Sequence, residues 1–209
     1  MKLKITYSTI LYLFFTFAVC NAQEEKKKIL FFGDSITAGY GLEKDQAFPA
    51  LIQKKIDSLG YSYNVVNAGL SGETSAGGLR RIDWVARQKI DIFVLELGGN
   101  DGLRGIEPES TKDNLIKIIK KVRSKYPDVK ILFTGMQAPP NMGIDYTEKF
   151  KNIFYSVADS MDVYFYPFIL EDVAGYEELN LPDGIHPTAE GHQIIADNLW
   201  PKLKAIIES

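Results

Sequence analysis

The sequence predicts a single domain of the α/β class, in which one parallel sheet of about five strands lies between layers of helices. Two observations support this prediction. Short, mainly apolar runs alternate along the chain with longer stretches in which apolar residues recur at helical spacing. The runs do not alternate polar with apolar residues, and such strands are typical of a parallel sheet that helices cover on both faces. The repeated order of strand and helix favours the same class.

The elements follow one another in a regular order after the first 27 residues. The predicted strands cover residues 29–32, 63–66, 92–97, 131–133 and 163–169. The predicted helices cover residues 48–59, 76–89, 110–126, 146–161 and 188–207. Gly60 follows the first helix as a C-cap signal, and Pro127 follows the third as a stop signal. No linker or repeat interrupts this order, so we expect one domain over residues 28–209.

Residues 1–22 differ in composition from the rest of the chain. Lys2 and Lys4 precede an uncharged, mainly apolar stretch over residues 5–19, and charged residues follow the junction. This order is typical of a secretory signal peptide, and the apolar stretch is shorter than the roughly twenty residues of a membrane-spanning helix. We therefore expect cleavage after residues 1–22, a charged stub over residues 23–27, and an exported protein, either periplasmic or secreted.

Cys20 is the only cysteine of the chain and lies at this junction. One alternative to simple export is a lipid anchor at Cys20, as in bacterial lipoproteins, although residues 17–19 match the expected pattern imperfectly. An uncleaved N-terminal anchor is the other alternative. A chain with one cysteine forms no internal disulfide, and a cysteine removed or modified at this junction is no active-site nucleophile.

Charge and motif content exclude several classes of function. The formal net charge is −3 and no concentrated Lys/Arg patch occurs beyond residues 26–28, which argues against nucleic-acid binding. Asp34, Glu96 and Asp101 lack a His-rich or regularly spaced set of ligands, so we expect no metal site. The phosphate-binding glycine patterns are absent at the first strand, which argues against a nucleotide. We expect a monomer with no cofactor and no obligate protein partner.

Small and polar residues follow the first three predicted strands, where each strand ends. They lie at residues 33–35, 67–72 and 98–101. Because ligands bind beyond the carboxyl ends of the strands in open α/β sheets, we expect these segments to converge on one site. Ser35 is a candidate nucleophile, since a hydroxyl directly after a buried strand is held on rigid backbone. Alone, Ser35 is explained equally well as a helix N-cap.

A serine nucleophile needs a base, and the chain has two histidines. His186 lies in a loop beside Gly184 and Pro187 and can be aimed at the site, whereas we expect His192 to be exposed on a helix. Asp183 precedes His186 by three residues, so one tight loop can place its carboxylate against the imidazole Nδ1–H. The Pro-Asp-Gly sequence at Asp183 is also a turn signal, and the two roles are compatible.

Acyl transfer also needs donors for the negative charge that develops on the carbonyl oxygen. The candidates are the backbone N–H groups of Ser35 and Gly72 and the side-chain amide of Asn100. Gly72 permits close backbone approach. Without such a role, Gly72 is a turn glycine and Asn100 forms an Asx turn.

Four short motifs occur in order along the chain. They are Gly33-Asp34-Ser35-Ile36, Gly72, Gly99-Asn100-Asp101 and Asp183-Gly184-Ile185-His186-Pro187. Together they resemble the sequence blocks of the GDSL/SGNH hydrolases. Residues 33–41, 67–78, 96–105 and 139–141 look like the bacterial branch of arylesterases, acyl-CoA thioesterases and lysophospholipases.

This resemblance implies a three-layer, flavodoxin-like α/β/α fold and hydrolysis of ester bonds. It implies a catalytic triad of Ser35, Asp183 and His186. It also implies an oxyanion hole formed by Ser35, Gly72 and Asn100.

Apolar residues in the loops around this site predict a cleft for an acyl or aryl group, although each could equally pack in the core. They are Tyr40, Leu42, Leu103, Ile106, Met136, Pro139, Pro140 and Met142. We take Tyr40, Leu103, Pro139 and Pro140 as the substrate-binding candidates. The favoured function is a serine esterase for acyl or aryl esters, thioesters or lysophospholipids. The alternatives are a carbohydrate O-deacetylase of the same family and a non-catalytic surface binding protein that keeps the fold.

Overall fold

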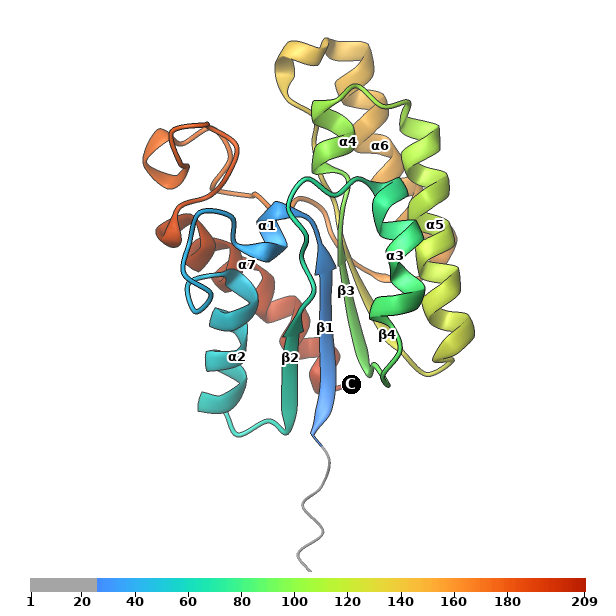
Figure 1. Ribbon diagram of the computed structural model, residues 1–209, viewed down its shortest axis with the longest axis vertical. Helices are drawn as coiled ribbons and strands as arrows, with labels where there is room; N and C mark the ends of the chain where they lie inside the picture. Colours follow the sequence, from blue (N-terminus) through green and yellow to red (C-terminus); the bar gives the residue numbers. More distant parts are fainter. Residues whose placement is uncertain (1–25) are drawn as a thin grey trace, which may run out of the picture.

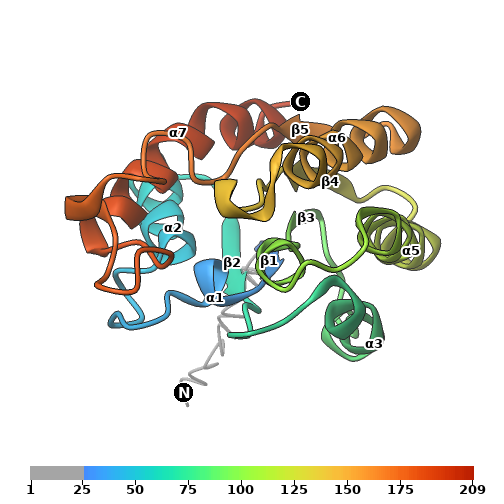
Figure 2. The ribbon, with the colours of Figure 1, turned by 90° about the horizontal axis from the view of Figure 1, so that it is seen from above.

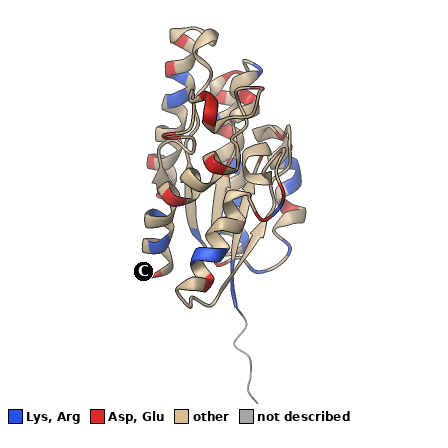
Figure 3. Ribbon diagram, turned by 90° about the vertical axis from the view of Figure 1, so that its left-hand side faces the viewer, with Lys and Arg blue, Asp and Glu red and all other residues tan. Residues whose placement is uncertain are grey.

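The computed structural model describes residues 26–209 of the chain (Figure 1). The predicted signal peptide and the junction at Cys20 lie outside the described residues. Within residues 26–209, no helix is long and apolar enough to cross a membrane. On the face shown in Figure 3, acidic and basic residues are interspersed along the helices and loops.

Five parallel strands form one sheet in the order β2-β1-β3-β4-β5. They are β1 (Lys27–Gly33), β2 (Tyr63–Asn67), β3 (Ile92–Glu96), β4 (Lys130–Thr134) and β5 (Tyr164–Tyr166). The predicted fold class and number of strands are confirmed. β1 begins at Lys27, one residue before the domain start that we expected. β5 is shorter than predicted, because Pro167 has no N–H with which to continue the ladder.

The predicted helices are all present, and they cover both faces of the sheet. They are α2 (Phe48–Ser58), α3 (Ser75–Val85), α5 (Pro108–Lys125), α6 (Ile144–Met161) and α7 (Ala189–Ile207). Seen from above, α2 and α7 lie together on one face, and α3, α5 and α6 lie on the other (Figure 2). The result is a three-layer α/β/α domain, in agreement with the fold class that we expected.

Four short elements also occur in the connections. They are α1 (Ser35–Ala38), α4 (Gly99–Leu103) and the 3₁₀ turns η1 (Pro140–Met142) and η2 (Glu177–Leu179). α1 and α4 begin directly after β1 and β3, and the parallel register pairs Gly33 with Glu96 at the ends of these strands. The two short helices therefore begin at the same edge of the sheet, where the site is built.

The core consists of the central strands and the apolar faces of the helices. Phe31, Phe93 and Phe133 are fully buried in neighbouring strands. Burial of a side chain of this size contributes on the order of 2–3 kcal/mol. Gly33 ends β1 without a side chain, and a Cβ there would overlap Thr37 Oγ1 and Glu96 Oε2. This lack of space forces a glycine directly before the polar residues of the site.

Candidate active site

Ser35 is the first residue of α1 and lies directly beyond the end of β1. The residue is 7% exposed, so Ser35 is held within the domain with little contact to solvent. The N-cap of α1 is Asp34, whose Oδ1 accepts a hydrogen bond of 3.0 Å from the Ile36 N–H. The alternative interpretation of Ser35 as the helix N-cap is therefore wrong, and its hydroxyl is available for another contact.

That contact is with His186, in the loop before α7. The Ser35 Oγ lies 2.9 Å from His186 Nε2, and His186 Nδ1 lies 2.7 Å from Asp183 Oδ2. Serine, histidine and aspartate thus form one continuous hydrogen-bonded chain. The imidazole side chain is 17% exposed and the Asp183 side chain is 39% exposed. The end of this hydrogen-bonded series at Asp183 is thus more exposed than the imidazole.

The loop that carries Asp183 and His186, called the histidine loop below, is held by its own backbone hydrogen bonds. Leu181 N–H donates to the His186 carbonyl at 2.7 Å, and Gly184 N–H donates to the Leu181 carbonyl at 2.8 Å. Asp183 Oδ1 also accepts from the N–H groups of Ile185 and His186, at 3.0 and 3.1 Å. The tight loop expected from the Asp183 spacing is present, and it fixes both triad candidates as one unit.

The charge of Asp183 follows from these contacts. Burial would raise the pKa of its carboxyl. The hydrogen bonds from the His186 ring and from the two backbone N–H groups outweigh burial and lower the pKa to about 2. Asp183 is therefore ionised at neutral pH and faces the Nδ1 side of the imidazole with acceptors only.

Tyr40 contacts the ring of His186. Its ring packs against the His186 ring with 4.4 Å between the centroids, although the Tyr40 side chain is 50% exposed. The adjoining Gly41 approaches Leu181 so closely that a Cβ would lie 2.7 Å from Leu181 Cδ1. The segment after α1 therefore supports the histidine loop from the side.

The three oxyanion-hole candidates all carry donors that the protein leaves free. Within residues 26–209, neither the Ser35 N–H nor the Gly72 N–H donates to a protein acceptor. Asn100 Nδ2 donates one hydrogen bond of 3.3 Å, to Asp34 Oδ2, and has a second N–H. Gly72 has φ +77, and a Cβ there would meet only Arg104 Nη2, at 3.9 Å. The positive φ favours a glycine at this position, and the lack of nearer protein atoms leaves the expected close approach of a substrate a prediction.

Arg81 of α3 forms a brace for the segment with Gly72, that is, a set of contacts that holds this segment in place. Arg81 donates through Nε to Glu73 Oε2 at 2.8 Å and through Nη1 to the Ala68 carbonyl at 3.0 Å. Its guanidinium lies over the Phe32 ring of β1, 4.3 Å from the ring centroid. Sequence reasoning missed this brace, because nothing in a lone arginine on a helix indicates which loop it contacts.

A second brace joins the segments of Gly72 and Asn100. Asp101 is fully buried and accepts hydrogen bonds from Ser75 N at 2.8 Å and Ser75 Oγ at 2.6 Å. It also accepts from Thr111 Oγ1 at 3.1 Å. Asp101 thereby ties the start of α3 to α4 and α5. Among residues 26–209, no group of histidine, cysteine or acidic side chains is arranged to hold a metal ion.

The second histidine lies away from Ser35 and is not exposed. His192 in α7 is 1% exposed, and its Nδ1 accepts a hydrogen bond of 3.1 Å from Phe48 N–H at the start of α2. The expectation of an exposed side chain is therefore wrong. Burial, and to a lesser extent the nearby His186, lowers the pKa of His192 to about 4. His192 is a structural residue that joins two helices.

The apolar residues expected around the site differ in exposure. Leu103 and Pro140 are exposed and Pro139 is half-buried, whereas Met136 is 4% exposed and belongs to the core. α4 lies against the segment before η1, since a Cβ on Gly102 would be 3.3 Å from Ala138 Cα. Leu103, Pro139 and Pro140 therefore come from neighbouring segments.

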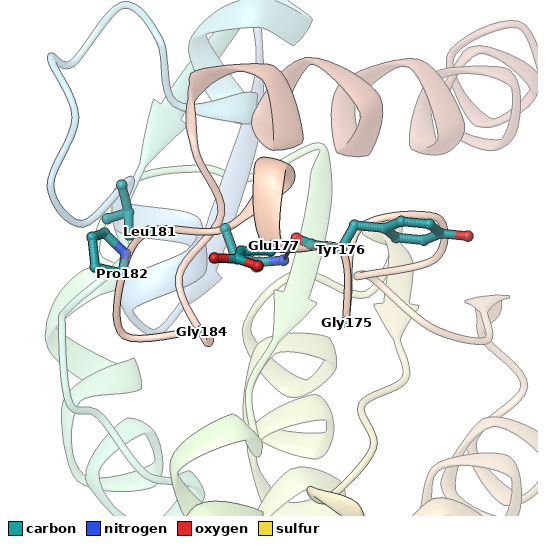
Figure 4. Close-up of a pocket in the computed structure, with 7 residues that line it drawn as sticks. Gly175, Tyr176, Glu177, Leu181, Pro182 and Gly184 are labelled. Atoms are coloured by element: carbon teal, nitrogen blue, oxygen red, sulfur yellow. Dashed lines mark hydrogen bonds between the residues drawn. The ribbon is translucent and has the colours of Figure 1, made fainter.

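A cavity of about 570 Å³ lies between η2 with the segment before it and part of the loop that carries His186 (Figure 4). Its lining residues come from the segment before η2, from η2 and from the loop: Gly175, Tyr176, Glu177, Asn180, Leu181, Pro182 and Gly184. Neither Ser35 nor His186 lines it. The cavity therefore does not indicate where an ester would meet the hydroxyl.

Comparison with known proteins gives matches over most of the chain. Residues 31–194 match the GDSL-like lipase/acylhydrolase family. Esterase TesA of Pseudomonas aeruginosa is 41% identical over 186 residues, which cover 88% of this chain and 92% of TesA. The thioesterase 1/protease 1/lysophospholipase L1 of Escherichia coli K12 is 37% identical over 180 residues, covering 86% of this chain and 84% of that protein.

The match extends to solved structures. The crystal structure of the psychrotrophic esterase EstA from Pseudoalteromonas sp., inhibited by monoethylphosphonate, superposes with a TM-score of 0.81. It is 31% identical, and the match covers 88% of this chain and 100% of EstA.

Proposed function

Because the chain belongs to the GDSL-like lipase/acylhydrolase family, we propose that Ser35 attacks carboxylic esters and thioesters and forms an acyl-serine intermediate. The protein is an ester-hydrolysing serine hydrolase, as its esterase and thioesterase relatives are. One observation carries the assignment of its residues. It is the pair of hydrogen bonds that joins Ser35 Oγ to His186 and His186 to the Asp183 carboxylate, with heavy-atom distances of 2.9 and 2.7 Å.

The proposed reaction has two steps. Ser35 Oγ attacks the ester carbonyl while His186 Nε2 takes the hydroxyl proton, and the same nitrogen then protonates the leaving alcohol or thiol. Water, deprotonated by His186, attacks the acyl-serine and releases the carboxylic acid. Asp183 holds the imidazole in the tautomer with its proton on Nδ1 and stabilises the imidazolium that forms in each step.

The negative charge on the tetrahedral intermediate needs donors on the far side of the carbonyl. We assign this role to the N–H groups of Ser35 and Gly72 and to the free N–H of Asn100. Their lack of other protein acceptors within residues 26–209 supports the assignment. Loss of one such donor typically lowers kcat on the order of 10²–10³-fold.

The proposed substrates are small acyl or aryl esters, thioesters and lysophospholipids. The names of the relatives include arylesterase and lysophospholipase activities. Tyr40, Leu103, Pro139 and Pro140 lie in the connections between strands and long helices and would contact the acyl or aryl group. The N-terminal composition supports export, and the mass of the N-terminus of the protein purified from its own cells distinguishes cleavage, lipidation at Cys20 and retention.

A panel of p-nitrophenyl esters of increasing acyl length, run beside acetylated xylan, tests the substrate class. We expect turnover of the p-nitrophenyl esters, with kcat/KM that varies with acyl length, and no release of acetate from xylan. The Ser35→Ala variant serves as the blank for each substrate. Activity confined to acetyl groups on the polysaccharide would replace this proposal with a carbohydrate O-deacetylase.

A further inference from the structure

Two buried carboxyl groups, Asp34 and Glu96, lie next to Ser35 and have no role in the proposed reaction. Each is 1% exposed. They are in contact through the backbone, because Asp34 N–H donates to Glu96 Oε2 at 3.2 Å. Two ionised carboxylates buried together are costly, so such a pair holds a proton. The hydrogen bonds around the pair indicate which residue carries it.

Both oxygens of Asp34 act as acceptors. Oδ1 accepts from Ile36 N–H at 3.0 Å, and Oδ2 accepts from Asn100 Nδ2 at 3.3 Å. An ionised carboxylate satisfies two donors in this way, whereas a protonated carboxyl presents an O–H at one of its oxygens. The two contacts therefore fit the ionised form of Asp34, which has acceptors only.

Glu96 has the complementary pattern. Its Oε2 accepts from Thr37 Oγ1 at 2.7 Å and from Asp34 N–H. Its Oε1 is buried, and no donor within residues 26–209 lies in hydrogen-bond reach of it. Burial, and next the charge of Glu96, raises the pKa of Asp34 well above its ordinary value, and burial raises the pKa of Glu96. The shift at Asp34 alone would favour a proton there, but the part of it that Glu96 causes disappears once Glu96 is protonated. A proton on Glu96 Oε1 removes that charge and displaces no donor.

The state of Asp34 matters because it determines how the Asn100 amide is turned. The oxygen and nitrogen of an amide have nearly the same shape, so packing alone does not select between its two orientations. The Asp34 carboxylate selects the nitrogen, which donates one N–H to Asp34 and keeps the other N–H free. In the opposite orientation, the amide oxygen would repel Asp34 and would also face the oxyanion.

We propose that Asp34 is a positioning residue that turns the Asn100 amide so that its nitrogen faces the oxyanion, and that Glu96 holds the single proton of the buried pair. This proposal rests on the proposed function, because it takes Asn100 as an oxyanion donor. Neither carboxyl touches the substrate. Asp34 acts through Asn100, and Glu96 acts by leaving Asp34 ionised.

The isosteric variants Asp34→Asn and Glu96→Gln test the proposal as a matched pair. In D34N a single amide oxygen must serve two donors, so Asn100 loses its orientation. We expect kcat to fall about 10- to 100-fold, towards the cost of losing one oxyanion donor, with KM little changed. In E96Q the amide oxygen can accept both existing hydrogen bonds and the nitrogen replaces the oxygen that has no donor. We expect kcat to fall less than about threefold.

A double-mutant cycle with Asn100→Ala shows whether Asp34 acts through Asn100. In the N100A background, we expect D34N to lower kcat by less than about threefold further, because the group that it orients is gone. The thermal unfolding midpoint of each variant separates loss of fold from loss of rate. If D34N does not fold, the other two variants still test the proposal. It requires a large loss in kcat for N100A and a small one for E96Q, and the opposite result for either variant would contradict it.

Three results would overturn the proposal. One is a larger loss in kcat for E96Q than for D34N, which would place the proton on Asp34. Another is an equal effect of D34N with and without the Asn100 side chain. In either case the serine reaction itself would stand, since wild-type turnover and its loss in S35A do not depend on this pair. An unchanged kcat in N100A would overturn both this proposal and the assignment of Asn100 to the oxyanion hole.

Discussion

At the residue scale, the reactivity of Ser35 depends on which nitrogen of His186 carries the proton. Asp183 offers only acceptors to Nδ1, at 2.7 Å, so the proton of the neutral ring lies on Nδ1 and the lone pair of Nε2 faces Ser35 Oγ. Tyr40 packs on the ring face and limits its rotation. The histidine is thus oriented by an ionic partner and by an aromatic one before any substrate arrives.

Asp183→Asn tests this orientation directly. The amide oxygen can keep the contacts to the backbone N–H groups of Ile185 and His186, while the amide nitrogen then donates to the ring Nδ1. The ring proton moves to Nε2, which can no longer accept the Ser35 proton. We expect kcat for p-nitrophenyl acetate to fall on the order of 10³–10⁴-fold.

The control for this variant is its unfolding free energy in urea, which should change little because the amide oxygen keeps the two contacts to backbone N–H groups. A fall in kcat of less than about tenfold in a folded D183N protein would mean that Asp183 does not set the tautomer.

Sequence reasoning worked at this scale where partners are close in the chain. The contact of Asp183 with His186 follows from a spacing of three residues and a turn, and the structure has it. The cap of α1 by Asp34 and the packing of Tyr40 on His186 depend on how two loops meet, and no local pattern encodes that meeting. The catalytic roles of Ser35, Asp183 and His186 stay predictions.

At the element scale, the site is held by contacts between helices that are far apart in the sequence. α7 follows the histidine loop and packs against α2. His192 of α7 accepts the Phe48 N–H, one of the N–H groups that have no partner within α2, and its ring stacks on the Phe48 ring. Only a neutral imidazole can accept this hydrogen bond, so this contact between α7 and α2 depends on pH.

His192→Asn tests the pH dependence of stability. The pKa of His192 is lowered from 6.5 to about 4 in the folded protein, so the unfolded chain binds the proton more readily. The stabilisation is complete above pH 6.5 and is lost as the pH falls from 6.5 through 4. H192N keeps an acceptor for Phe48 N–H and does not titrate. Between pH 7 and pH 4.5, we expect the wild type to lose about 2 kcal/mol more unfolding free energy than H192N.

Denaturant unfolding of the two proteins at several pH values measures this difference. The buried carboxyls of Asp34 and Glu96 have raised pKa values and change stability with the opposite sign, but they are present in both proteins and cancel in the comparison. Parallel curves for the wild type and H192N over this range would show that His192 is not held neutral by the fold.

The long elements could be predicted from the sequence and the short ones could not. The five strands and five long helices carry a periodic apolar pattern, and each is found near its predicted place. α1 and α4 span only four and five residues, too few for a helical period to be recognised. Both begin in the glycine-rich turns after strands, where the backbone conformation follows from contacts with neighbouring loops.

At the scale of the whole molecule, the strand order places the site. With the order β2-β1-β3, the segments that follow the first three strands along the chain lie side by side at one edge of the sheet. They bring Gly72, Ser35 and Asn100 together from three connections, as the parallel sheet predicted. The histidine loop arrives from the far end of the chain, between β5 and α7, and completes the arrangement.

The same architecture explains why the substrate is harder to predict than the reaction. The reacting groups come from strand ends and from one tight loop. Arg81 and Asp101 hold the segments of Gly72 and Asn100 through hydrogen bonds, and the loop of Asp183 and His186 is held by its own backbone. The residues that would contact the acyl or aryl group include exposed ones in short connecting elements, such as Leu103 at the end of α4 and Pro140 in η1. Exposed apolar residues are common on protein surfaces, so their presence alone does not specify a ligand.

Covalent labelling of the protein with a fluorophosphonate, read by intact mass and peptide mapping, tests the central claim most directly. Fluorophosphonates react with activated serine hydroxyls. The related esterase EstA is inhibited by monoethylphosphonate in its crystal structure. We predict one adduct per chain in the wild type, located on Ser35, and neither adduct nor ester turnover in the folded Ser35→Ala variant. Equal labelling of wild type and S35A, or full turnover by S35A, would contradict the assignment of Ser35 as the nucleophile.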